Sequence, residues 1–197
     1  DRTRKGNEPL PAGVVLMSKL SGFPEYLPAE RQLEQALLDH LRRVFELHGF
    51  ASVETRAVET METLTRKGDI NKEVYVIKRV HAEAGEDSGM GLHFDLTVPF
   101  ARYVVENAGQ LAFPFRRYQI QKVWRGERPQ QGRFREFVQA DIDIVGDGTL
   151  PFHADVEVAR VMADALAGAP LGEVTFVLQV SNRKVLEGFY LGLGIKD

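Results

Sequence analysis

Apolar residues recur at the spacing of a single helix face in four segments of the chain. The longest of these patterns predicts a helix over residues 28–47, which Pro28 can begin and Gly49 can end. Shorter patterns of the same kind predict three further helices, over residues 98–107, 154–166 and 182 to about 191.

Polar and apolar residues alternate in two later segments, residues 118–123 and 137–145, which predicts two strands. The stretch between them contains Pro129, Gly132 and several cations, so the pair reads as an antiparallel hairpin with a long, basic loop. Short β-branched or aromatic runs predict further strands, over residues 50–58, 74–77, 92–94 and 174–180. Residues 1–20 are expected to be an extended lead-in and residues 82–89 a loop.

This order of elements predicts an α+β fold, in which helices flank an antiparallel sheet. The chain has 197 residues, of which 44% are hydrophobic and 27% charged, and its net charge is −3, which excludes an intrinsically disordered chain. With no cysteine it has no disulfide framework, thiolate nucleophile or cysteine-based zinc site. It shows no membrane-length apolar run and no signal peptide, so we expect a cytoplasmic protein without membrane contact.

Although the net charge of the chain is small, its positive and negative residues are strongly separated along the sequence. Residues 115–135 carry one acid, Glu127, against seven cations: Arg116, Arg117, Lys122, Arg125, Arg128, Arg133 and Arg135. Residues 136–157 carry no Lys or Arg and six acids: Glu136, Asp141, Asp143, Asp147, Asp155 and Glu157. Such runs are commonly solvated surface, but here the charges alternate with apolar residues along predicted strands.

The second strand of the hairpin has one polar and one apolar face. Gln139, Asp141 and Asp143 share the first face, and the second holds Val138, Ala140, Ile142 and Ile144, which are expected in the core. The polar face is either an ordinary solvent-facing sheet surface or the floor of a cleft that offers acceptors to a cationic ligand. The alternation alone leaves both interpretations open.

The hairpin loop combines cations with an aromatic residue. Arg125 and Glu127 lie two residues apart at the end of the first strand, and Arg133 and Phe137 follow the loop. Arginine donates parallel, charge-assisted hydrogen bonds to phosphate or carboxylate, and a ring can stack on a base, so the loop could hold a nucleotide. The same features suit a nucleic-acid-binding module, but the nearby acidic face and the net charge of −3 disfavour one.

Asp95 and Thr97 form a third polar element, just before Pro99. Either residue could cap the helix predicted over residues 98–107, which is the simplest interpretation. They could also contribute to a ligand site.

Together these residues resemble the class II aminoacyl-tRNA synthetases, and specifically the histidyl-tRNA synthetases. The segment 115–137 contains Arg125-Gly126-Glu127, a loop, and then Arg133 four residues before Phe137, a pattern similar to motif 2 of the class. The segment 92–103 resembles the histidyl-specific stretch that precedes it, and the long helix with residues 49–59 resembles motif 1. Arg56 stands where motif 1 usually has proline, and His93 stands where a related arginine is common.

The resemblance implies a set of roles. The implied catalytic residue is Arg125, which would bridge the α-phosphate of ATP and the histidine carboxylate. The implied ATP-binding residues further include Glu127 at the adenine, Phe137 stacked on it and Arg133 on the outer phosphates. Histidine would be held at its amino group by Asp95, Thr97 and Gln139, and at its imidazole by Asp143.

The resemblance further implies ATP and Mg²⁺ as cofactors, with no dedicated protein metal site. It implies L-histidine and tRNA(His) as partners, and a homodimer built on motif 1. The expected activity is the conversion of histidine to histidyl-adenylate and its transfer to tRNA(His). We expect residues 1–197 to be the N-terminal portion of a catalytic domain with an incomplete sheet, lacking motif 3 and the anticodon-binding domain. The alternative is a synthetase-like paralogue or inactive fragment that binds histidine as a regulatory or interaction module.

Overall fold

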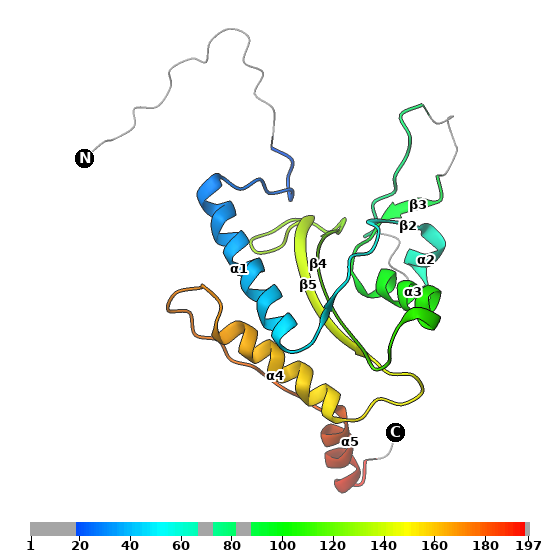
Figure 1. The fold of residues 1–197 in the computed structure, drawn as a ribbon, viewed down its shortest axis with the longest axis vertical. Coiled ribbons are helices and arrows are strands. Elements are labelled where there is room, and N and C mark those ends of the chain that lie inside the picture. Colours follow the sequence, from blue (N-terminus) through cyan, green and yellow to red (C-terminus); the bar gives the residue numbers. More distant parts are fainter. Residues whose placement is uncertain (1–18, 67–72, 82–87, 196–197) are drawn as a thin grey trace, which may run out of the picture. The chain divides into compact units, whose positions relative to one another are not determined.

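The structure is a computed structural model that describes residues 19–66, 73–81 and 88–195 (Figure 1). It contains five α-helices in the described residues: α1 (Pro28–Leu47), α2 (Met61–Thr65), α3 (Thr97–Asn107), α4 (His153–Ala167) and α5 (Arg183–Gly192). A short 3-10 helix, Ala108–Gln110, follows α3. The strands are β1 (Ala51–Ser52), β2 (Val58–Thr60), β3 (Met90–Leu92), β4 (Phe115–Trp124) and β5 (Glu136–Val145).

The chain divides into two compact units. Among the described residues, the first unit comprises residues 19–25, 55–66, 73–81, 88–106 and 121–139, and the second comprises residues 26–54, 107–120 and 140–195. The long strands β4 and β5 each contribute residues to both units.

The second unit is built on α1, whose predicted bounds are confirmed. The Glu30 carboxylate accepts the Leu27 N–H at 2.9 Å, which satisfies a donor just before the first turn. The helix ends where Gly49 adopts a φ of 78°, a left-handed conformation that costs glycine little. From there the Phe50 N–H returns to the Phe45 carbonyl at 3.0 Å and directs the chain into β1.

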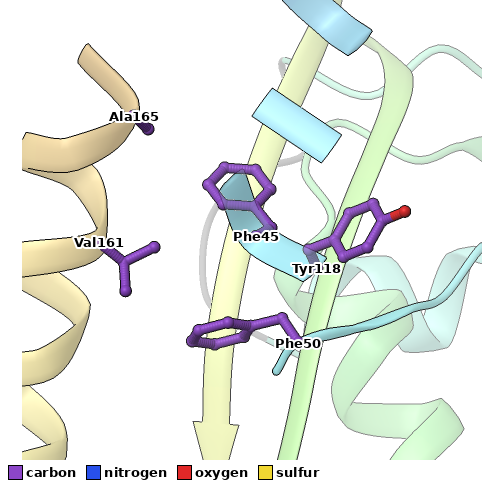
Figure 2. Close-up of a cluster of buried hydrophobic side chains, with 5 residues drawn as sticks. All are labelled: Phe45, Phe50, Tyr118, Val161 and Ala165. Carbon is purple, nitrogen blue, oxygen red and sulfur yellow. The ribbon is translucent and has the colours of Figure 1, made fainter. Parts of the chain in front are cut away.

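The core of this unit lies between α1, α4 and the strands. Phe45, Phe50, Tyr118, Val161 and Ala165 form its buried cluster, and α1 and α4 lie side by side in contact. Figure 2 shows Val161 and Ala165 on α4 pointing toward the three aromatic rings. Burial of these side chains contributes roughly 1.5–3 kcal/mol for each large apolar residue, so this cluster fixes the helices on the sheet.

The apolar face of β5 is confirmed in part. Ile142 and Ile144 pack against the core cluster as predicted. Ala140, which was expected in the core, is instead exposed. It lines a cavity of about 370 Å³ beside β5, together with residues of α1 and α4 such as Leu41 and Met162.

The sheet has the order β1-β4-β5 and is mixed, which refines the expected antiparallel sheet. β1 pairs in parallel with β4, with Ala51 opposite Arg117 and Ser52 opposite Tyr118. Parallel neighbours require a long crossover, and residues 53–114 supply it. The predicted arrangement of helices beside a sheet containing the β4–β5 hairpin is confirmed.

The first unit contains a small antiparallel pair, β2 with β3, in which Val58 lies opposite Leu92. The buried Glu59 on β2 is an ion-pair partner of Arg56 and of Arg102 on α3. This carboxylate therefore ties α3 to β2. It also gives Arg56 an ion-pair partner.

Four strand predictions differ from the structure. The strand predicted over 50–58 is instead two short strands, β1 and β2, with residues 53–57 between them in neither, and the strand predicted over 92–94 is β3, which ends at Leu92. Residues 74–77 form only an isolated bridge, at which Val76 faces Gly91. The prediction of a strand over 174–180 is wrong: these residues are exposed and have no strand partner within the described chain. Their β-branched composition favours extended backbone, but a strand also requires a neighbouring edge. The lead-in at residues 1–18 and the loop at 82–87 lie outside the described residues.

Candidate active site

The hairpin loop has a defined internal geometry. Its base is closed by the Arg125 N–H, which donates to the Arg135 carbonyl at 2.8 Å. At its tip Gln130 and Arg133 exchange backbone hydrogen bonds of 3.2 and 2.9 Å, and Gly132 takes a φ of 75° there. A left-handed residue at this point allows the tight turn.

Arg135 anchors the loop to the segment before α1. Its N–H donates to the Gly22 carbonyl at 2.7 Å, and its guanidinium donates to the carbonyls of Glu127 and Ser21 at 3.1 and 3.3 Å. A Cβ on Gly22 would lie 2.9 Å from Arg135 Cγ, so the close approach requires glycine. Arg135, a member of the basic run, therefore serves the loop's structure.

Arg125 is the centre of the site in the first unit. Its Nε donates to the Phe94 carbonyl at 3.0 Å and its Nη2 donates to Gln139 Oε1 at 3.1 Å. The guanidinium carbon lies 5.0 Å from the centre of the Phe137 ring. The structure thus brings three of the predicted site residues together and places them beside the strand end that leads to Asp95.

Within the described chain, Nη1 of Arg125 makes no hydrogen bond. Because Nε and Nη2 are fixed by the protein, the guanidinium plane is oriented in advance for an additional acceptor. One face of the Phe137 ring lies against Arg125, so a stacked base would use the other face.

Asp95 confirms the simpler interpretation of its motif. It is buried, and its Oδ1 accepts the Val98 N–H at 3.2 Å at the start of α3. Thr97 is the first residue of α3 and is exposed. Their role toward an amino group stays a prediction.

His93 fixes the strand end that carries these residues, and sequence reasoning gave it no role. Its side chain is fully buried, and Nε2 donates to the Lys122 carbonyl at 2.7 Å. Its backbone N–H donates to the Ala57 carbonyl and its carbonyl accepts the Trp124 N–H, at 2.9 and 3.1 Å. The imidazole also stacks on the Trp124 ring, with 5.6 Å between the centres.

A polar cavity of about 770 Å³ opens beside the loop. Glu127 and Arg133 both line it and lie 3.6 Å apart, so two predicted ATP-binding residues share one hollow. Glu73 also lines it, and its carbonyl accepts the Gly126 N–H at 2.8 Å. Sequence reasoning missed Glu73, because only the fold brings it to the loop.

Asp143 lies further along β5, in the second unit. Its Oδ2 is 2.6 Å from Nη2 of Arg117, whose side chain is fully buried. Burial raises the pKa of Asp143; Arg117 opposes that rise and Asp141 adds to it. Burial lowers the pKa of Arg117, against the pull of the two carboxylates. The polar face of β5 is therefore half-buried and charge-paired here, rather than a simple solvated surface.

The described residues contain no group of three or more His, Cys, Asp or Glu side chains that could hold a metal ion. No helix in the same part of the chain is long and apolar enough to cross a membrane.

Comparison with known proteins agrees with this geometry. Solved structures similar to the chain include histidyl-tRNA synthetase from Nostoc sp. PCC 7120, with a TM-score of 0.78 and 40% identity over 91% of this chain and 40% of that one. An ATP phosphoribosyltransferase regulatory subunit/histidyl-tRNA synthetase from Bacillus halodurans has a TM-score of 0.67 and 26% identity, over 81% of this chain and 40% of that one. The fold is thus that of the class II aminoacyl-tRNA synthetases.

Residues 22–196 match the family model described as histidyl-tRNA synthetase. The chain is also 60% identical, over 192 residues, to a histidine--tRNA ligase of Micrococcus luteus. The chain belongs to the histidyl-tRNA synthetase family. The alignment covers 91% of this chain and 42% of that relative, so the chain spans less than half of the relative's length.

Proposed function

We propose that this chain supplies the ATP- and histidine-binding part of a histidine--tRNA ligase. The reaction is attack of the histidine carboxylate on the α-phosphorus of ATP, which forms histidyl-adenylate and releases pyrophosphate. The histidyl group is then transferred to tRNA(His). We place this activity in the cytoplasm, with the tRNA it would charge, and in a homodimer as the family resemblance implies.

The observation that carries the proposal is the fixed guanidinium of Arg125. Two anions, a carboxylate and a phosphate, must meet for the reaction to occur. A cation held by the Phe94 carbonyl and Gln139, with Nη1 available, reduces their repulsion and stabilises the charge that develops. Because the donor is oriented before substrate arrives, little reorganisation is needed at the reaction step.

The remaining roles follow the loop and its cavity. Arg133 would contact the outer phosphates, Glu127 the adenine edge, and the free face of Phe137 the adenine ring. Asp95, Thr97 and Gln139 would accept the histidine amino group, and Asp143 the imidazole N–H. Mg²⁺ would enter bound to the phosphates of ATP, since its preference for phosphate oxygens and water needs few protein ligands.

ATP–pyrophosphate exchange tests the proposal. It should be measured with histidine and a panel of other amino acids, in the 197-residue chain and in a chain extended to the relatives' length. Exchange that depends on histidine in the extended chain is the expected result. Histidine binding without exchange in the extended chain would contradict the proposal and support a regulatory relative instead.

A further inference from the structure

We propose that Arg117 is a positioning residue for substrate selection, which holds the Asp143 carboxylate as an oriented acceptor for the imidazole N–H. The inference rests on the proposed function, because Asp143 is the residue assigned there to the imidazole. The family resemblance assigns no function to Arg117 itself.

The first support is the rigidity of the place from which Arg117 acts. β4 is the central strand of the described sheet, and Arg117 lies opposite Ala51 of β1. On the other side, counting back along both strands from the Arg125–Arg135 hydrogen bond brings Arg117 opposite Asp143 of β5. A side chain that leaves a central strand has little freedom to move, which suits a group that must orient another.

The second support is the asymmetric burial of the pair. The Arg117 side chain is 0% exposed, whereas that of Asp143 is 38% exposed. The Arg117 guanidinium is therefore out of reach of a ligand that enters from solvent, while the Asp143 carboxylate remains accessible to one. The 2.6 Å contact between Arg117 Nη2 and Asp143 Oδ2 is an ion pair whose angles do not meet hydrogen-bond geometry, and no described residue makes a hydrogen bond to Oδ1. The pairing thus leaves one carboxylate oxygen to receive a donor from a ligand.

The third support is electrostatic. Asp143 is partly desolvated and has Asp141 two residues away on the same strand face, and both influences favour a neutral carboxyl. Arg117 is the opposing influence. Without it Asp143 would shift toward a protonated acid, which donates a hydrogen bond and no longer offers two acceptor oxygens.

A purely structural ion pair is the competing explanation. Buried ion pairs often contribute little net stability, because the cost of desolvation offsets their attraction. A structural role predicts that loss of Arg117 weakens the binding of every substrate equally. A positioning role predicts that it weakens only the binding of a ligand that donates a hydrogen bond to Asp143.

The test compares three variants in the chain extended to the relatives' length. Arg117→Met removes the cation and keeps much of its volume, and Arg117→Lys restores a charge. Arg116→Met is the matched control, since Arg116 is the neighbouring residue on β4 but pairs with Glu157 of α4. Each variant is assayed by pyrophosphate exchange for the KM of histidine and of ATP, and for the Ki of an analogue with thiophene in place of imidazole.

For Arg117→Met we expect the KM of histidine to rise about 10- to 100-fold, the range for loss of one charged hydrogen bond. The KM of ATP and the Ki of the thiophene analogue should stay near wild type, and Arg117→Lys should recover part of the loss. Equal weakening of histidine and analogue, or no change in either, overturns the inference. If Arg117→Met does not fold, Arg117→Gln takes its place, because it removes the charge and keeps polar groups at the buried position. An unchanged preference for histidine over the analogue in Arg117→Gln is then the contrary result.

Asp143→Ala separates this inference from the proposed function. If Asp143→Ala leaves the preference for histidine over the analogue intact, the assignment of the imidazole to Asp143 is wrong. If Asp143→Ala removes the preference and Arg117→Met retains it, only the positioning role is wrong.

Discussion

The buried carboxylate of Glu59 should contribute to stability mainly through Arg102 and little through Arg56. Glu59 Oε1 lies 2.8 Å from Nη2 of Arg102, and Oε2 lies 2.9 Å from Nη2 of Arg56. The distances are nearly equal, so distance does not rank the two pairs. Exposure does: the side chain of Arg102 is 15% exposed and that of Arg56 is 56% exposed.

The magnitudes follow from this difference. Removing the partner of a buried charge costs about 3–5 kcal/mol. Because Arg56 remains beside Glu59, Arg102→Met should cost less than this, about 2–3 kcal/mol. An exposed pair contributes about 0.2–1 kcal/mol, so Arg56→Met should stay below about 1 kcal/mol. For a chain of this size these values correspond to a fall in Tm of roughly 4–12 °C and at most about 4 °C, respectively.

Thermal unfolding followed by circular dichroism measures both variants against wild type. Glu59→Gln supplies the internal control, because it removes the charge that both arginines share. It should be less destabilising than Arg102→Met, because it removes the buried charge, whereas Arg102→Met leaves that charge without its main partner. A loss for Arg56→Met equal to that for Arg102→Met would refute the argument that burial determines the contribution.

Three further predictions concern the site. Arg125→Ala should lower the rate of histidine activation at least 10²- to 10³-fold, the usual effect of losing one preorganised donor, and near-normal kcat in pyrophosphate exchange would contradict its role. Asp143→Ala should weaken the binding of histidine more than the binding of ATP in calorimetric titrations. Equal losses of affinity for the two ligands would exclude contact between Asp143 and the imidazole. Gly22→Ala combines a strained φ of 86° with a 2.9 Å contact to Arg135, so it should lower Tm by several degrees, whereas Gly109→Ala, which meets no atom within 4 Å, should not.

The sequence was sufficient for elements whose signals are local. The bounds of α1 were predicted correctly, because Pro28 and Gly49 mark its ends and its apolar face is continuous. The β4–β5 hairpin was predicted from its alternation, although both strands are longer than expected. Asp95 or Thr97 was predicted to cap the helix that contains Pro99, and Asp95 accepts the Val98 N–H at the start of α3.

Features that depend on residues far apart in sequence could not be predicted in this way. The parallel pairing of Ala51 with Arg117 joins two strands that are separated in sequence by residues 53–114. The segment 174–180 has the composition of a strand, yet composition does not show whether an edge is available beside it. Arg117 was counted as one cation of a basic run, because the predicted strand began at residue 118; β4 begins at Phe115, and the pairing with Asp143 is seen only in the fold.

The contact between Gly22 and Arg135 has a consequence for how the chain can be shortened. The backbone N–H groups of Arg135 and Glu136 both donate to the Gly22 carbonyl, so residues just before α1 complete the hydrogen bonding of a loop more than a hundred positions later. A truncated chain that begins at Pro28 would retain every described helix and strand but would lose the two hydrogen bonds to the Gly22 carbonyl. Its expected defect is in the geometry of the hairpin loop, while its helices and strands would remain intact.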